Sequence, residues 1–237
     1  MPELKVNLLE KEYHCLICQQ LMQPTTEIVP CFYCGKREKA DYVCPNGHYI
    51  CEECRLATPD EIVRKTCEAS VEVDPLRIAF KILSHPAIPM HSPVHHYLVA
   101  CTLLAALRNA TKFKAERVTF DDALRRGKRI PYGSCGSLGV CGAAVGVGIA
   151  VSIFTRATTM SDKERSLAMQ AVVEALKNIA EIGGPRCCKA STFTAIITGA
   201  KFFKNLETSI QIPEKPQFCS FMSVNEDCLK ERCPYFR

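Results

Sequence analysis

Residues 15–54 read CLICQQLMQPTTEIVPCFYCGKREKADYVCPNGHYICEEC. This stretch contains four pairs of soft ligands, in order Cys15 and Cys18, Cys31 and Cys34, Cys44 and His48, and Cys51 and Cys54. A pair separated by two or three residues turns both side chains toward one point, and two pairs complete a tetrahedral zinc site. The stretch therefore predicts two zinc ions, one bound by four cysteines and one by three cysteines and a histidine. The alternative, a disulfide framework, needs neither regular C-x2-C pairs nor a matching histidine.

The segment from Cys44 to Cys54 resembles the central part of RING-type and treble-clef modules. Carried over from RING domains, the resemblance implies that the first ligand pair shares an ion with the fourth, and the second pair with the third. The order departs from RING, because the second pair precedes Cys44 instead of following Cys54. The likeness thus extends to the metal scaffold and not to ubiquitin-ligase activity. Since about 40 residues bury little core, we expect this module to fold only with metal.

After residue 56 the pattern becomes helical, which predicts a mainly α chain. We expect a two-zinc, small β-containing module at 1–56, an all-α domain of about six or seven helices at 57–204, and a cysteine-bearing tail at 205–237. Cap signals predict helix starts at Thr58–Pro59, Asp74–Pro75, Ser92–Pro93 and Ser161. Further helices are expected around 120–126, at 133–155, and from 187 or 188 to 204.

Residues 133–155 carry no charge and are long enough to span a bilayer. Their many small residues instead favour a buried helix packed closely against others, so no membrane association is expected. The N-terminus lacks a continuous apolar run, which predicts no secretory signal and a cytoplasmic location with reduced thiols.

The net charge is +5, and a basic cluster runs from Arg125 to Arg129. Such a cluster suits phosphate or nucleic acid, but it is more often a solvated helix end. A protein or RNA partner is expected to bind through this cluster or through the zinc module.

Three further segments combine residue types suited to catalysis. His91 and His95 come at a helix start, where imidazoles serve as metal ligands or as acid and base near neutral pH. Cys135 and Cys141 lie in a glycine-rich run whose backbone can approach a ligand closely, although a helix seam with inert cysteines explains the same run. We expect these four residues to share one buried site with the adjacent pair Cys187 and Cys188.

Cys187 and Cys188 are too close for an ordinary disulfide, because neighbouring Cα atoms lie about 3.8 Å apart and disulfides need roughly 4.4 Å or more. A helix start flanked by Arg186 and Lys189 should lower a thiol pKa and supply a reactive thiolate. Two packed, inert thiols are the alternative.

The tail holds Cys219, Cys228 and Cys233. These thiols are candidate ligands of a cluster or metal ion, with a fourth ligand from the body such as Cys67. Packed or free thiols would explain them equally well.

Three strings carry a wider resemblance: MHSPVHH at 90–96, GSCGSLGVCGAAVGVGI at 133–149 and GGPRCCK at 183–189. They resemble a cysteine-rich domain family of unknown function from anaerobic archaea and bacteria, whose members often carry a similar zinc module in front. The resemblance covers most of residues 15–200 and implies an architecture without an established reaction.

Two functions compete on this sequence. The first is a redox or sulfur-transfer enzyme that uses thiols, an iron–sulfur cluster or a further metal in the helical domain, beside the two zinc ions. The second is a non-enzymatic adaptor whose zinc module binds protein or nucleic acid. Whether the chain is an enzyme, and its oligomeric state, are left open.

Overall fold

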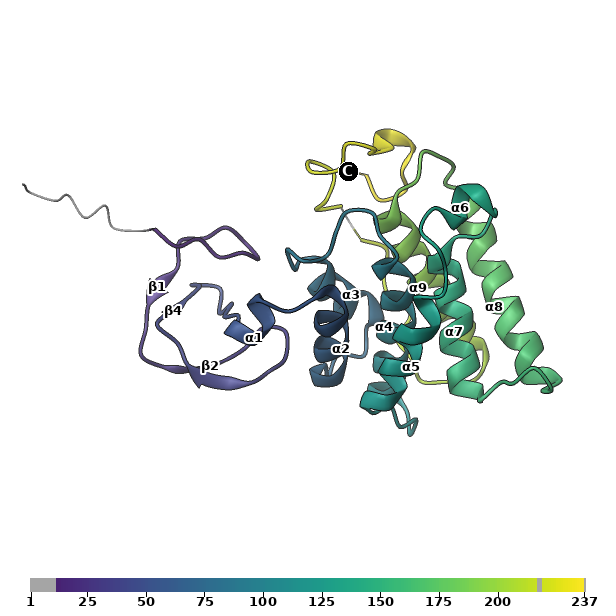
Figure 1. Cartoon of the computed structure of the whole chain (residues 1–237), viewed down its shortest axis with the longest axis horizontal. Coiled ribbons are helices and arrows are strands. Elements are labelled where there is room, and N and C mark those ends of the chain that lie inside the picture. Colours follow the sequence, from purple (N-terminus) through teal and green to yellow (C-terminus); the bar gives the residue numbers. More distant parts are fainter. Residues whose placement is uncertain (1–11, 217–218, 237) are drawn as a thin grey trace, which may run out of the picture. The chain divides into compact units, whose positions relative to one another are not determined.

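The structure is a computed structural model that describes residues 12–216 and 219–236 (Figure 1). Residues 1–11, on which the expectation of no secretory signal depends, lie outside this range. The chain divides into two compact units, the first ending at Leu56 and the second beginning at Ala57. Helices dominate the described residues, and strands occur in two small sheets, which confirms the mainly α class.

The first unit contains two short antiparallel sheets and one helical turn. Its elements are β1 (Gln23–Pro24) paired with β4 (Tyr42–Val43), β2 (Ile28–Pro30) paired with β3 (Arg37–Lys39), and α1 (Glu52–Arg55). These strands are two or three residues long, and their side chains are exposed or half-buried. The strands therefore supply little hydrophobic core, and buried cysteines take its place.

The second unit is a helical bundle with an irregular segment after its last long helix (Figure 1). Its helices are α2 (Pro59–Ala69), α3 (Pro75–Leu83), α4 (Val94–Ala110), α5 (Arg117–Gly127), α6 (Ser134–Ser137), α7 (Gly142–Thr155), α8 (Lys163–Ala180), α9 (Cys188–Asn205) and the 3-10 turn η1 (Lys230–Arg232). Among the described residues, no helix has both the length and the apolar character needed to cross a bilayer.

Local cap chemistry explains two of the helix starts. Thr58 and Glu61 form a complete capping box at α2, and the Asp74 carboxylate accepts from the first backbone N–H groups of α3. The capping box expected at Ser161 is absent, because the Ser161 hydroxyl instead accepts from the backbone N–H of Thr158, over 3.0 Å. Helix α8 begins only at Lys163.

The single helix expected at 133–155 is wrong in one respect, because the chain forms two helices there. Gly139, with φ of 66°, lies between α6 and α7 and takes the left-handed conformation that glycine adopts at little cost. The longer part, α7, packs against α4 and α8. A Cβ atom added to Gly146 would lie 2.3 Å from the backbone oxygen of His96, so this glycine sets the close approach of α7 to α4.

Candidate functional site

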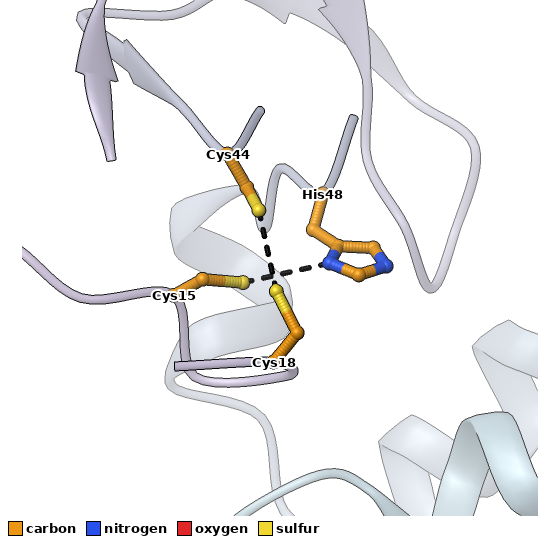
Figure 2. A group of neighbouring side chains, drawn as sticks. All are labelled: Cys15, Cys18, Cys44 and His48. Carbon is orange, nitrogen blue, oxygen red and sulfur yellow. Dashed lines mark hydrogen bonds between the residues drawn. The ribbon is translucent and has the colours of Figure 1, made fainter. Parts of the chain in front are cut away.

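The first unit brings Cys15, Cys18, Cys44 and His48 together, and Figure 2 shows three sulfurs and the histidine Nδ1 facing one point. All four ligand atoms lie within 4.8 Å of one another. The sulfurs of Cys18 and Cys44 are 3.4 Å apart, and the sulfur of Cys15 is 3.6 Å from the imidazole. Zinc–sulfur bonds of about 2.3 Å in a tetrahedron place two sulfurs roughly 3.8 Å apart. The group therefore has the ligands and spacing of a tetrahedral metal site.

The loops around this group orient its sulfurs. Backbone N–H groups of Ile17 and Asn46 donate to the sulfurs of Cys15 and Cys44, each over 3.4 Å. The Asn46 side-chain amide also donates to Cys18. Such hydrogen bonds stabilise thiolate ligands and fix their direction.

Cys31, Cys34, Cys51 and Cys54 form the second group, also within 4.8 Å of one another. The sulfurs of Cys34 and Cys51 lie 3.7 Å apart, and the backbone N–H of Cys51 donates to Cys31. The neighbouring Cys31 sulfur, followed by burial, raises the pKa of Cys54. A bound cation would remove this repulsion between thiolates, so this buried all-cysteine group also suits a metal ion.

The ligand pairing implied by RING domains is wrong. The structure joins the first pair to the third and the second pair to the fourth. Antiparallel pairing of β1 with β4 returns the chain to the first pair just before Cys44. The turn between β2 and β3 carries the second pair, and the Phe32 N–H donates to the Tyr49 oxygen, close to Cys51. Strand pairing, rather than ligand spacing, thus decides which ligands share an ion.

In the second unit, a cavity of about 340 Å³ lies where the starts of α4, α7 and α9 meet α6. Residues from all three catalytic segments expected from the sequence line it. The cysteine and histidine residues lining this cavity are His95, His96, Cys135, Cys141, Cys187 and Cys188. We call it the Cys-His cavity.

The thiols of Cys187 and Cys188 are not activated as expected. Burial raises the pKa of Cys188 to about 11, although the backbone N–H of Ser92 and the Arg186 guanidinium both lower it. Burial also raises the pKa of Cys187. Loss of hydration thus outweighs the helix start and the neighbouring cation, so these thiols need a base or a metal to become thiolates.

The Lys189 ammonium points to the ring of His95 instead of activating a thiol. Its Nζ lies 3.2 Å from His95 Nε2 and 3.3 Å from the Pro89 carbonyl oxygen. The His95 Nδ1–H donates to the Ser92 carbonyl over 3.0 Å, so Nε2 accepts from Lys189. Burial, then the charge of Lys189, lowers the pKa of His95 to about 3. His95 is therefore a neutral, fully engaged side chain.

Acid should destabilise the fold through His95. Its pKa is about 3 in the folded chain, against about 6.5 when unfolded, so between these values only the unfolded chain binds the proton. The free energy of unfolding should therefore fall by up to roughly 1.4 kcal/mol per unit as the pH drops from 6.5 to 3. Denaturant titrations across this range should show a flatter slope for His95→Gln, and an unchanged slope would contradict the assignment.

His96 is a cavity residue that the sequence analysis did not select. Its ring donates to the Ile130 carbonyl, and its Nδ1 has no hydrogen-bond partner among the described residues, which leaves Nδ1 as the unprotonated nitrogen. Burial lowers the pKa of His96, so it is uncharged at neutral pH. A Cβ atom on Gly142 would lie 2.3 Å from this ring, so glycine is required where α7 begins. The adjacent letters HH could not show that His96 lines the cavity as well as His95.

His91 faces the tail instead of the Cys-His cavity. Its Nε2–H donates to Asn225 Oδ1 over 3.2 Å, and Asp227 lies 3.6 Å away. Asn225 in turn donates to the sulfur of Cys187, over 3.6 Å. This chain of contacts joins the start of α4, the start of α9 and the tail.

The tail cysteines Cys219, Cys228 and Cys233 line a second, smaller cavity, together with Cys187, and we call it the tail cavity. Cys67, suggested above as the fourth ligand, does not line it. That residue is fully buried in α2, where the Arg108 guanidinium donates to its carbonyl oxygen over 3.1 Å. The chain thus places Cys187, rather than Cys67, beside the tail thiols.

The basic cluster at 125–129 is largely paired with acids. Asp122 binds both Arg125 and Arg126, and Lys128 binds Asp60. Three of its cations are therefore engaged within the unit, as at an ordinary helix end.

A family model described as "Family of unknown function (DUF5714)" matches residues 63–236. The matched region includes every residue of the Cys-His cavity and of the tail cavity, and it excludes the ligands of both N-terminal groups. Neither the curated proteins nor the solved structures give a match.

Proposed function

The chain belongs to DUF5714, a family of unknown function, and we propose that it is a metal-binding redox or sulfur-transfer enzyme acting in the Cys-His cavity. The observation that carries this proposal is the meeting of three sequence segments around one cavity of about 340 Å³. Four thiols and two imidazoles line it, and each is a nucleophile, a metal ligand or a base. A cavity of this size suits a small substrate.

Sulfur transfer is the reaction that this set of side chains fits best. The thiolate of Cys188 would attack the outer sulfur of a persulfide donor, forming a persulfide on Cys188 and releasing the donor as its thiolate. A thiol of an acceptor then takes the outer sulfur, which restores the Cys188 thiolate. Cys141 and Cys135 line the same cavity and are the candidate acceptors within the chain.

Neutral His96 is the base that we propose for this step. His96 and Cys188 line the same cavity, and the unpartnered Nδ1 would take the proton from the Cys188 thiol, whose raised pKa keeps it protonated at neutral pH. The Ser92 N–H and Arg186 then stabilise the thiolate that forms. His95 is held by Lys189 and Ser92, so its role is to position this wall of the cavity.

The proposed metal content differs between the two units. Zinc fits both N-terminal groups, the one with three cysteines and a histidine and the one with four cysteines, where it would stabilise the fold. For the helical unit we propose iron, as an iron–sulfur cluster.

The sulfur-transfer step can be tested with a small persulfide donor under anaerobic conditions. Peptide mass spectrometry should find one added sulfur atom on Cys188, and Cys188→Ser should abolish it. His96→Gln should slow the transfer at neutral pH by about 100-fold, the usual size of a lost general base. Cys101→Ser, at a fully buried thiol of α4 away from the cavity, is the matched control and should leave the transfer unchanged. Sulfur spread over many cysteines, or none on any cavity thiol, would reject the proposal.

A protein-binding adaptor is the second candidate, because the first unit exposes large apolar side chains. Leu16, Leu21 and Ile28 are 47%, 48% and 61% exposed. A photo-crosslinking residue at Ile28 should capture one defined protein in cells, and the same residue at exposed Val118 of the helical unit should not. Equal labelling from both positions would argue against a binding surface on the zinc unit.

A further inference from the structure

Four cysteines from separated parts of the sequence line the small tail cavity. Cys187 lies just before α9, and Cys219, Cys228 and Cys233 come from the segment after it. The cavity measures about 10 Å³, room for about one water molecule. A free substrate therefore does not fit between these thiols.

The spacing of these thiols does not suit a single tetrahedral ion. Among the described residues, three or more ligand atoms within 4.8 Å of one another occur only in the two N-terminal groups. The four tail-cavity thiols are thus spread more widely than the ligands of one zinc ion. A polynuclear cluster, in which each thiolate binds a different iron, requires this wider spread.

The surroundings of Cys187 match those of cluster ligands. Its sulfur accepts from the Asn225 side-chain amide over 3.6 Å and from the Ala190 backbone N–H over 3.5 Å. N–H···S hydrogen bonds of this kind tune iron–sulfur clusters. The ring of Phe221 lines the same cavity, and the Lys189 ammonium lies 4.9 Å from its centroid. This buried cation would offset the negative charge of four thiolates.

Two sets of side-chain contacts fix the position of the tail against the helical bundle. The hydroxyls of Tyr235 and Thr194 lie 2.7 Å apart and fasten the tail to α9. His91 holds Asn225, which in turn contacts Cys187. His91 is therefore a positioning residue for the tail cavity.

We propose that Cys187, Cys219, Cys228 and Cys233 bind a [4Fe–4S] cluster. Cys187, Ala190 and Leu229 line both cavities, so the cluster shares a wall with the Cys-His cavity. The adjacent cysteines thereby divide their roles, Cys187 binding the cluster and Cys188 serving the reaction. Use of the cluster in that reaction rests on the proposed function, whereas its binding does not.

The test uses the full chain, purified anaerobically and, in parallel, reconstituted with ferrous iron and sulfide. We expect about four iron atoms and four sulfides per chain beside zinc, and an electron paramagnetic resonance signal of a [4Fe–4S] cluster after reduction. Cys228→Ser and Cys233→Ser should lose most of this iron. Cys67→Ser, at a buried thiol outside the cavity, and Cys188→Ser should retain it.

Absence of iron after reconstitution, zinc in its place, or full iron retention in both tail variants would overturn the proposal. Circular dichroism shows whether a variant is folded. If both tail variants unfold, the electron paramagnetic resonance spectrum of the unaltered chain decides whether a [4Fe–4S] cluster is bound. An intact cluster in a chain that transfers no sulfur would reject the proposed reaction alone. His91→Gln should shift the reduction potential of the cluster or speed its loss, which a residue unconnected to the cavity would not do.

Discussion

The double variant Cys15→Ser, Cys44→Ser is expected to bind one zinc ion where the unaltered chain is expected to bind two, and Cys15→Ser, Cys51→Ser is expected to bind none. The structure assigns Cys15 and Cys44 to one group and Cys51 to the other. The pairing implied by RING domains predicts the reverse, because it joins Cys15 to Cys51. Native mass spectrometry of the full chain counts the ions and separates the two arrangements.

The effect on stability should be large in the first unit. Structural zinc contributes about 10–16 kcal/mol to the folding of small zinc modules. The short strands of this unit bury little that could compensate for its loss. Hydrogen exchange should therefore show loss of protection around the emptied group, while the helical circular dichroism signal changes little.

Two outcomes would contradict this prediction. Loss of one ion by the Cys15, Cys51 variant and of two by the Cys15, Cys44 variant would restore the RING pairing. If every variant kept both ions, Cys15, Cys44 and Cys51 would not be metal ligands. Cys67→Ser changes a buried thiol outside both groups and should keep both ions.

Gly146→Ala should lower the free energy of unfolding of the helical unit by about 3 kcal/mol. The added methyl group would lie 2.3 Å from the His96 backbone oxygen and 3.0 Å from Val99 Cβ. A backbone atom of a buried helix cannot rotate away, so α4 and α7 must separate along their seam. Overpacking of a buried seam costs typically 1–3 kcal/mol, and displaced backbone brings the cost to the upper end.

Gly136→Ala is the matched control, because a Cβ atom there would meet nothing within 4 Å and its backbone is not left-handed. Chemical denaturation of both variants, followed by circular dichroism, measures the difference. Equal stability of the two variants would show that the α4–α7 seam can relax. The Gly146→Ala variant should also perturb thiol labelling in the Cys-His cavity, because its wall includes His96 and the start of α7.

Much of this structure could be predicted from short sequence patterns that involve only neighbouring residues. Ligand spacing identified all eight members of the two N-terminal groups, since two side chains three or four positions apart share a loop. The capping residues Thr58 and Asp74 located α2 and α3, because their hydrogen bonds are made within one turn.

The glycines from 142 to 148 likewise predicted a closely packed buried helix, which the structure confirms. The pattern could not place the break at Gly139, because an uncharged run of small residues is compatible with either one helix or two.

By itself, then, the sequence determined the mainly α class, the helix starts with local caps and the eight members of the two N-terminal Cys/His groups, all properties of chain neighbours. Tertiary structure alone decided which ligand pairs share an ion, that His96 rather than His91 faces the Cys-His cavity, and that Cys187 joins the tail thiols. It also reversed the expected pKa shift of Cys188, because burial outweighed the helix start and Arg186. Each of these depends on how segments far apart in the chain pack together and on how much water that packing removes. The spacing of residues in the sequence does not predict either.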